Sequence, residues 1–270
     1  MKNDNPMFSI IVPTFNRPAG LQRAVESVKR QTNQDFELIV VDDASHLDYA
    51  QRVCSESGLN ARVLRNTRNL GAGGARNAGI HVSCGRYVSF LDDDDEYGPD
   101  FLASSLATLQ GTNDATVMSW CSVRWVDDLA KDGTGWRTRT FQSQHTSVVA
   151  LYEDLMSIGT GCGVTIKSAF LDRRDWFDPR LRTVEDADLF LRIIASGRRP
   201  VVVPGVHATV HNHGDVRLTD VRMHELRIRE CNLLLQRYTD VFDRYPSLRS
   251  QLQQQIDHLY SEVSAHGVVS

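Results

Sequence analysis

The first 110 residues alternate between short apolar segments and longer amphipathic ones, and this alternation restricts the fold more than any other feature of the chain. Four segments are nearly continuous in apolar residues: FSIIV (8–12), FELIVV (36–41), ARVLR (61–65) and RYVSFL (86–91). Such segments are typical of strands covered on both faces. Helical patterns separate them, from Pro18 to about Gln31, from His46 to about Ser57 and from Ala72 to about Val82. The alternation predicts an α/β fold with a mostly parallel central sheet flanked by helices, in which ligands bind at the carboxyl ends of the strands.

The rest of the chain is less regular up to Val221. Its pattern predicts strands at 115–126, 136–141, 200–203 and 206–211, and helices at 147–156 and 184–196. Two more helices are expected over 221–242 and 247–264, with a break at Tyr245-Pro246. We therefore expect one domain, residues 1–215, followed by a C-terminal helical extension, residues 216–270. The extension can pack on the core, form a homodimer or rest on an anionic membrane. Leu233, Leu234 and Leu235 need burial, which favours packing on the core.

Composition narrows the class of protein. With 41% hydrophobic and 24% charged residues among 270, the chain can bury a substantial core. A net charge of −4 argues against a nucleic-acid partner. Five cysteines without Cys-x-x-Cys spacing favour neither a disulfide framework nor a zinc site, which fits a reducing compartment. Neither a signal peptide nor a transmembrane segment is recognisable, so we expect a cytoplasmic protein, at most peripheral to a membrane.

Residues 92–96 read DDDDE and directly follow the fourth predicted strand. Two unit charges about 4 Å apart repel by roughly 4 kcal/mol at an effective dielectric constant of about 20, so water or a cation must offset the repulsion. Because alternate residues of an extended segment point the same way, Asp92 and Asp94 can share one Mg²⁺ or Mn²⁺ ion, while Asp93 and Asp95 support the pair or face solvent. The alternative is a solvated turn that caps a helix starting at Pro99.

Two other segments end predicted strands at the same edge of the sheet. In VVDDAS (40–45), Asp43 can accept hydrogen bonds from a nucleobase or a ribose, or else cap the following helix. In IVPTFNRP (11–18), the residues Pro13, Thr14 and Phe15 can form a wall against a base, or else a turn at the start of a helix. Each segment has a structural and a functional interpretation.

Three further segments carry chemistry. NLGAGGARNAGI (69–80) has glycines that let the backbone approach a ligand, and its Arg76 can bind a diphosphate or pair with an acidic turn. In TVEDADLF (183–190), Asp186 can act as a general base at the same edge, although Thr183 and Asp186 also resemble a helix capping box. His211 and His213 alternate along a predicted strand, so they share a face and can bind a metal.

Taken together, these segments resemble the family 2 glycosyltransferases of the GT-A fold. The stretches SIIVPTFNRP, FELIVVDDAS, NLGAGGARNAGI, GRYVSFLDDDDEYGPDFL and FDPRLRTVEDADLFLRI match the pattern of that family in order and approximate spacing. The resemblance covers roughly residues 8–213. It implies a Rossmann-like fold with a nucleotide-sugar-binding half, residues 1–110, and an acceptor-binding half, residues 111–215.

The resemblance also implies roles for individual residues. The residues expected to bind the nucleotide-sugar donor are Pro13, Thr14, Phe15, Asn16, Arg17, Asp43, Gly73, Arg76, Asp92 and Asp93. The Asp92-x-Asp94 pair would hold Mn²⁺ or Mg²⁺, with Asp94 as the first ligand and His213 as a further candidate. Asp186 matches the catalytic base of the family.

The reaction implied is an inverting, metal-assisted transfer of a sugar from a nucleoside-diphosphate sugar, most commonly a UDP-sugar, to an acceptor hydroxyl. Such a transfer would serve polysaccharide, glycolipid or glycoconjugate biosynthesis. Trp120, Trp125, Trp136 and Trp176 lie in the acceptor half, where one or two are expected to stack on sugar rings.

Two other functions remain open. One is a metal-dependent sugar nucleotidylyltransferase, which VPTFNRPAG (12–20) disfavours because those enzymes generally carry a glycine-rich, basic signature near the first strand. The other is a non-catalytic nucleotide-sugar-binding protein on the same fold.

Overall fold

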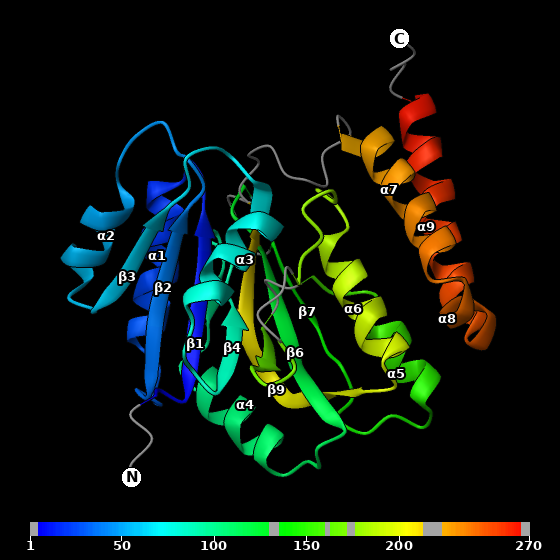
Figure 1. Cartoon of the computed structure of the whole chain (residues 1–270), viewed down its shortest axis with the longest axis horizontal. Helices are drawn as coiled ribbons and strands as arrows, with labels where there is room; N and C mark the ends of the chain where they lie inside the picture. Colours follow the sequence, from blue (N-terminus) through cyan, green and yellow to red (C-terminus); the bar gives the residue numbers. More distant parts are fainter. Residues whose placement is uncertain (1–4, 130–134, 160–162, 172–175, 213–222, 266–270) are drawn as a thin grey trace.

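A mixed β-sheet of nine strands forms the centre of the computed structural model (Figure 1), which describes residues 5–129, 135–159, 163–171, 176–212 and 223–265. The order of the strands is β3-β2-β1-β4-β8-β6-β9-β5, and β7 pairs with β6 outside this path. The first four strands are parallel neighbours: β1 (Phe8–Thr14), β2 (Phe36–Asp42), β3 (Ala61–Arg65) and β4 (Tyr87–Phe90). All four were predicted, and the α/β fold class is confirmed.

The second half of the sheet is formed by strands that differ in direction. Its members are β5 (Glu96–Tyr97), β6 (Thr116–Asp127), β7 (Trp136–Arg139), β8 (Val164–Lys167) and β9 (Arg199–Asn212). Strand β8 runs antiparallel to both β4 and β6, whereas β9 runs parallel to β6. The short strands β5 and β8 were not predicted, and the two residues of β5 carry too little pattern to be recognised.

Strand β9 replaces the two strands expected at 200–203 and 206–211. Its pairing with β6 shifts register between Cys121 and Ser122 and again between Ser122 and Val123. Gly205 adopts a positive φ of 99° at this irregularity. The break in the apolar pattern is therefore a bulge within one strand.

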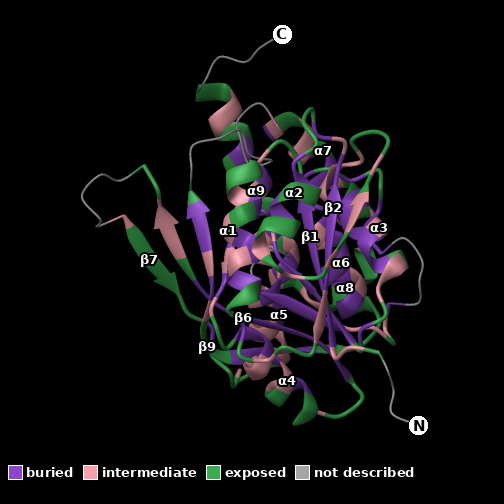
Figure 2. Cartoon of the chain, turned by 90° about the vertical axis from the view of Figure 1, so that its left-hand side faces the viewer, coloured by how far each residue is buried: buried purple, intermediate pink, exposed green. Residues whose placement is uncertain are grey.

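Helices cover both faces of the sheet. The helices α1 (Pro18–Lys29), α2 (Ala50–Ser57) and α4 (Phe101–Gln110) pack on one face, where Leu21, Val53 and Phe101 join Ile10 and Val40 in one apolar cluster. On the other face lie α3 (Gly71–Val82), α5 (Val148–Leu155) and α6 (Glu185–Ala195). Figure 2 shows the central strands buried, whereas all four residues of β7 are exposed.

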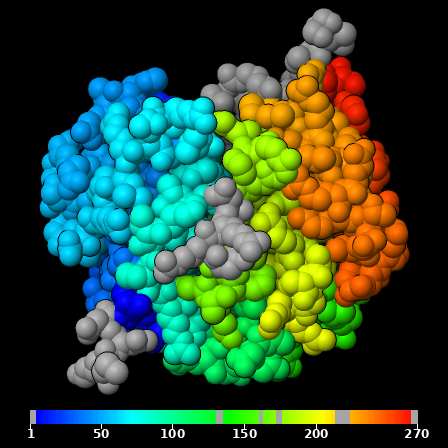
Figure 3. Space-filling model, in the orientation of Figure 1, coloured from blue at the N-terminus to red at the C-terminus, as the bar shows by residue number. Residues whose placement is uncertain are grey.

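The C-terminal residues form three helices: α7 (His224–Arg237), α8 (Thr239–Arg244) and α9 (Pro246–Ala265). The helix expected over 221–242 is thus interrupted at Tyr238. Figures 1 and 3 show these helices along one flank of the molecule, next to α6.

The apolar faces of the C-terminal helices belong to the same cluster as α3, α5 and α6. Leu234 is fully buried, while Leu233 remains 39% exposed. Packing on the core therefore accounts for the apolar face of α7, and the homodimer stays a prediction. None of the helices described is long and apolar enough to cross a membrane.

Candidate active site

A cavity of about 1190 Å³ lies at the carboxyl ends of the parallel strands. Its lining brings together segments that are far apart in the sequence. Of the predicted site residues, it includes Pro13, Thr14, Phe15, Asn16, Arg17, Asp43, Arg76, Asp92, Asp93, Asp94 and Asp186. Gly73 is not part of the lining, and His213 lies outside the described residues.

The acidic run forms one wall of this cavity, and its members have different environments. Single carboxylate oxygens of Asp92, Asp94 and Asp95 lie within 4.8 Å of one another. Hard oxygen ligands at this spacing fit a divalent cation such as Mg²⁺ or Mn²⁺. The structure thus adds Asp95 to the predicted pair, because the chain turns after β4 instead of remaining extended.

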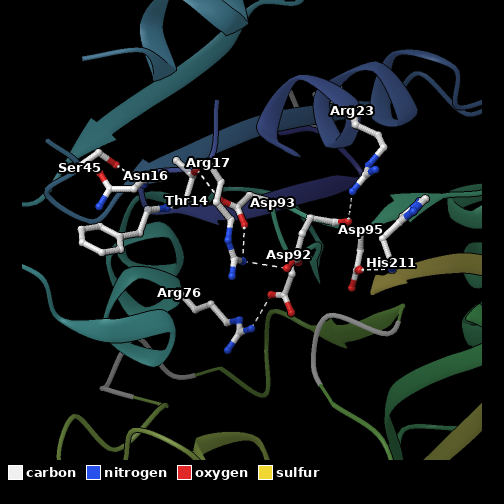
Figure 4. A network of polar contacts seen from close by, with 12 residues as sticks. Thr14, Asn16, Arg17, Arg23, Ser45, Arg76, Asp92, Asp93, Asp95 and His211 are labelled. Carbon is white, nitrogen blue, oxygen red and sulfur yellow. Dashed lines mark hydrogen bonds and ion pairs between the residues drawn. The ribbon is translucent and has the colours of Figure 1, made fainter. Parts of the chain in front are cut away.

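Arg17 and Arg76 both approach the acidic run (Figure 4). Arg17 lies 2.8 Å from Asp94, and Arg76 lies 2.6 Å from Asp92. Arg76 is only 3% exposed, and its second amino group lies 3.1 Å from Glu185. Two roles were expected for Arg76, and the structure shows one of them, the ion pair with an acidic turn. Because Arg76 also pairs with Glu185, it links that turn to α6.

Asp93 points into the protein. Its carboxylate accepts hydrogen bonds from the Thr14 hydroxyl at 2.6 Å and the Phe15 amide at 3.3 Å. Burial raises the pKa of Asp93 to about 6. Asp93 and Asp95 are each 4% exposed. Of the two alternatives expected for these residues, exposure to solvent is therefore wrong. The contacts of Asp93 make it a support of the β1–α1 turn.

That turn presents Phe15 to the cavity. Phe15 is 40% exposed, and its ring centroid lies 6.1 Å from that of His46. Asn16, at φ 58°, accepts a hydrogen bond from the His46 amide at 2.8 Å and donates its own amide to Ser45 at 2.9 Å. The side chain of Asn16 therefore fastens the two strand ends together, and the exposed ring of Phe15 is free to stack on a flat ligand.

Asp43 holds the start of α3. Its carboxylate accepts hydrogen bonds from the Gly71 amide at 2.7 Å, the Leu70 amide at 2.9 Å and the Asn66 side chain at 2.8 Å. An anion at a helix N-terminus is favourable. Asp43 thus acts as a cap, as the structural interpretation expected, but for α3 and not for the helix that follows it in sequence.

Gly73 lies close to the segment that leads into α6. A Cβ atom at this position would lie 3.1 Å from Phe177 and 3.2 Å from Glu185. The glycine allows α3 to pack closely against the segment that contains α6. Gly73 lies outside the cavity lining, and its assignment to donor binding stays a prediction.

The first turn of α6 carries Glu185 and Asp186. Glu185 is 6% exposed, and Asp186 is half-buried in the cavity wall. Burial raises the pKa of Asp186, while the positive charge of Arg227 on α7 opposes that rise. A carboxylate of raised pKa in a cavity is suited to take up a proton.

Thr183 does not cap α6 as expected. Its hydroxyl and its amide both donate to Glu230 of α7, at 2.6 and 2.9 Å. Glu230 also accepts the Arg182 amide at 2.9 Å and is only 5% exposed. Sequence reasoning missed Glu230, because nothing in a helical pattern shows which segment a buried carboxylate will reach.

The ring of His211 reaches the acidic run at its last residue, Glu96. Its two ring nitrogens each lie 2.9 Å from a carboxylate oxygen, one of Asp128 and one of Glu96. These carboxylates raise the pKa of His211, the contact with Glu96 most strongly. The histidine is therefore held in an ion-pair network beside the site, and its role as a metal ligand stays a prediction.

The cavity extends beyond the donor-side segments to α5, α7 and α9. These helices and the residues that flank them contribute Met156, Met223, Arg227, Leu248, Gln251, Leu252 and Gln255. Of the four tryptophans, Trp125 lines the cavity, Trp120 is fully buried, Trp176 is 9% exposed and Trp136 is 60% exposed on β7. The sequence carried no signal for the contribution of the C-terminal helices.

A mixed sheet with a carboxylate-rich cavity at its strand ends agrees with the resemblance to the GT-A glycosyltransferases, and comparison with known proteins supports this class. The sequence profile described as "Glycosyl transferase family 2" matches residues 9–178. Since the match covers more than half of the chain, the protein belongs to glycosyl transferase family 2.

Individual relatives agree with this assignment. The amylovoran biosynthesis glycosyltransferase AmsB of Erwinia amylovora is 29% identical over 217 residues, which cover 76% of this chain and 69% of AmsB. Three other related glycosyltransferases, 26 to 30% identical, are longer, and the chain spans 58 to 62% of their length.

Two solved structures share the fold. S. aureus TarS 1–349 in complex with UDP-GlcNAc has a TM-score of 0.64 at 19% identity, covering 84% of this chain and 66% of that chain. Mannosyltransferase PcManGT from Pyrobaculum calidifontis, in complex with GDP-Man and Mn²⁺, has a TM-score of 0.66 at 18% identity, covering 97% and 74%.

Proposed function

We propose that this protein is an inverting glycosyltransferase that moves a sugar from a nucleoside-diphosphate sugar, with a UDP-sugar as first candidate, to an acceptor hydroxyl. One observation carries the proposal: the cavity that holds the cluster Asp92, Asp94 and Asp95 also holds Asp186. The donors in TarS and PcManGT are UDP-GlcNAc and GDP-Man, which supports a nucleotide-sugar donor.

The donor is proposed to bind along the ends of β1, β2 and β4. Phe15 offers an exposed ring for the nucleobase, and Pro13 lies beside it in the cavity wall. Arg17, with 28% of its side chain exposed, is placed to meet a diphosphate next to Asp94. Asp43 lines the same wall, where its anchored carboxylate is proposed to lie beside the ribose.

Asp92, Asp94 and Asp95 would hold Mn²⁺ or Mg²⁺. A divalent ion bound there neutralises charge that develops on the leaving nucleoside diphosphate. The Mn²⁺ in the PcManGT complex supports this part of the proposal.

Asp186 is proposed as the general base. It takes the proton of the acceptor hydroxyl while that oxygen bonds to the anomeric carbon and the bond from this carbon to the donor phosphate breaks on the opposite face. The transfer needs one carboxylate as its base, whereas glycoside hydrolysis uses a pair of carboxylates. We place the reaction in polysaccharide or glycolipid biosynthesis, in line with the named role of AmsB.

A thermal-shift screen of UDP, GDP, ADP and CDP, each with and without Mn²⁺, tests the site, followed by an assay of nucleoside diphosphate release from the matching sugar nucleotides. We expect metal-dependent stabilisation by one nucleotide and release of that nucleotide. Consumption of pyrophosphate would instead identify a nucleotidylyltransferase. Binding without turnover, unchanged in Asp186→Asn, would identify a non-catalytic binding protein.

A further inference from the structure

A fully buried carboxylate lies two residues after Asp186 on α6. Asp188 accepts hydrogen bonds from the Arg237 guanidinium at 2.6 Å and from the Tyr238 hydroxyl at 2.8 Å. Arg192, one turn further along α6, also pairs with it. Removal of one partner would leave part of a buried charge uncompensated, which is unfavourable. Neither Asp188 nor any of these partners belongs to the described lining of the cavity, so their contacts do not serve a ligand directly.

Arg237 binds a second carboxylate, which lies outside α6. One amino group of its guanidinium lies 2.6 Å from Asp188, and the other lies 2.9 Å from Asp178. The planar fork of an arginine can hold two carboxylates at once in a fixed relative position. Arg237 thereby connects the two ends of residues 178–188, the segment that includes Asp186.

The start of this segment is attached to α3. The side chain of Asn77 donates to the Phe177 carbonyl at 2.7 Å and accepts the Phe177 amide at 3.0 Å. Both residues are buried, so this attachment is shielded from water. Because Asp178 follows directly, Arg237 holds α6 against a part of the chain that is already fixed.

Asp186 and Asp188 lie on different sides of α6. Successive residues of an α-helix are turned by about 100°, so residues two apart differ by about 200°. Asp186 accordingly lines the cavity, whereas Asp188 meets Arg237 of α7. An anchor on the far side determines the rotation of α6 about its axis, and with it the direction of the Asp186 carboxylate.

The carboxylate of Asp186 has little room to move. A Cβ atom at Gly159, which follows α5, would lie 3.3 Å from its Oδ2. Its Oδ1 accepts the Ala187 amide at 2.7 Å. A misplacement of about 1 Å can lower the rate of an enzyme by about 10²-fold. The position of this side chain therefore depends on a rigid support.

We propose that Arg237 is a positioning residue for Asp186, because it binds Asp178 and Asp188 together and so fixes the rotation of α6. The proposal rests on the function proposed above, in which Asp186 is the base. Arg237 lies two turns after Glu230 on the same face of α7. Helix α7 would thus support the segment in its middle through Glu230 and at both ends through Arg237.

The first test compares kcat and donor affinity between Arg237→Gln and the wild type, well below the thermal transition of either protein. We expect kcat to fall at least about tenfold, while the affinity for UDP or GDP with Mn²⁺ changes less than about twofold. Arg237→Lys should recover part of the loss, because it keeps the charge but cannot fork over two carboxylates. Arg249→Gln on α9 is the matched control, since it also breaks an arginine ion pair, with Asp243 at 2.9 Å, and kcat should not change.

The second test needs no turnover. Hydrogen exchange of the full chain should show the amides of residues 183–188 exchanging at least about tenfold faster in Arg237→Gln, with those of β1 unchanged. Tyr238→Phe removes one donor to Asp188 and leaves Arg237 in place, so it should raise exchange by less. This milder variant also provides the test if Arg237→Gln does not fold.

Several outcomes would overturn the proposal. An unchanged kcat in Arg237→Gln, with only a lower Tm, would leave Arg237 as a structural contact. Unchanged exchange at residues 183–188 in Arg237→Gln, or in Tyr238→Phe where only that variant folds, would do the same without an activity assay. An equal loss of kcat in Arg249→Gln would show that the effect is not specific to Arg237. If the wild type turns over no sugar nucleotide while exchange rises as expected, the proposed transferase fails, and Arg237 still orders the segment.

Discussion

The four aspartates at 92–95 are identical in sequence but are stabilised by different partners. Asp92 meets Arg76 and Asp94 meets Arg17, whereas Asp95 accepts the His211 amide at 3.1 Å. Because each partner comes from a different element, the mutual repulsion of the run is offset only in the folded chain. In the folded chain, Asp92, Asp94 and Asp95 therefore form one cluster, while Asp93 points inward and supports the β1–α1 turn.

Removal of Asp94 tests the metal cluster. At a ligand concentration near 100 Kd, a nucleoside diphosphate with Mn²⁺ stabilises a protein by about 2.7 kcal/mol. We expect Asp94→Ala to abolish most of the metal-dependent part of this gain, as read by thermal shift. Asp114→Ala, at an exposed position, is the control. An unchanged metal-dependent shift in Asp94→Ala would exclude Asp94 as a ligand.

Replacement of Asp186 tests the base. Asp186→Asn keeps the shape of the side chain but cannot take a proton, and general base catalysis contributes roughly 10²–10⁴-fold to a rate. We expect a loss of this order in the transfer rate, with the donor affinity unchanged in the same preparation. Transfer at the wild-type rate would refute the assignment.

Asp93 makes stability depend on pH. Burial raises its pKa from 3.8 to about 6, so between these values the folded protein holds a proton that the unfolded chain has released. The free energy of unfolding therefore falls as pH rises through this window, by about 3 kcal/mol from this group. Asp93→Asn should remove that slope, measured as the difference between variant and wild type in urea unfolding at pH 4 to 7 with EDTA. Parallel curves would contradict the prediction.

At the scale of elements, two helix starts are positioned by carboxylates from elsewhere in the chain. Asp43 at the end of β2 holds the start of α3, and Glu230 on α7 holds the residues that precede α6. Glu230 thus acts as a positioning residue, since the first turn of α6 carries Asp186. Neither arrangement is local in sequence.

Glu230→Gln tests this link. A glutamine replaces one acceptor oxygen with a donor, which leaves amides of Arg182 or Thr183 unpaired and costs about 1–3 kcal/mol of stability. We expect kcat to fall while donor affinity is retained, because the displaced residue would be Asp186. Thr183→Val, which loses only the hydroxyl bond, should show a smaller effect of the same kind, and Ile228→Val controls for looser packing of α7. A loss of stability with unchanged kcat would show that Glu230 is structural only.

At the scale of the whole molecule, the C-terminal helices are part of the core. Ile228, Leu234, Leu248, Leu252 and Ile256 are each at most 5% exposed and share one apolar cluster with α3, α5 and α6. Arg237 strengthens the contact through ion pairs with Asp178 and Asp188, at 2.9 and 2.6 Å. If the C-terminal helices were a separable extension of a complete domain, these side chains would not be buried against that domain.

Truncation after residue 222 tests this description. Each of these side chains contributes about 1.5–3 kcal/mol when fully buried, and the cut would also expose their partners. We expect the truncated chain to lose its cooperative thermal transition, whereas truncation after residue 265 should preserve it. A folded, nucleotide-binding fragment 1–222 would instead support the domain boundary expected near residue 215.

The sequence by itself determined most elements and the edge of the sheet where the site lies. Apolar runs such as FELIVV and the glycine and proline positions between them are local signals, so the parallel strands, α1 and α3 were predictable. Placement of Asp43 and Asp92 in one cavity also followed, since ends of parallel strands meet at one edge. The expectation that Asp186 joins them rested on the resemblance to the family, because Asp186 lies at the start of a helix. The resemblance to family 2 glycosyltransferases rested on the same segments and is confirmed.

Only the tertiary structure decided what each polar group contacts. The inward turn of Asp93, the capping of α3 by Asp43 and the use of Gly73 for helix packing depend on partners 27 to 112 residues distant. The same holds for Glu230 and Arg227, which a helical pattern presents as ordinary surface charges. Hydrogen bonds and ion pairs are specified by atoms a few ångströms apart in space, and sequence periodicity carries no information about that proximity.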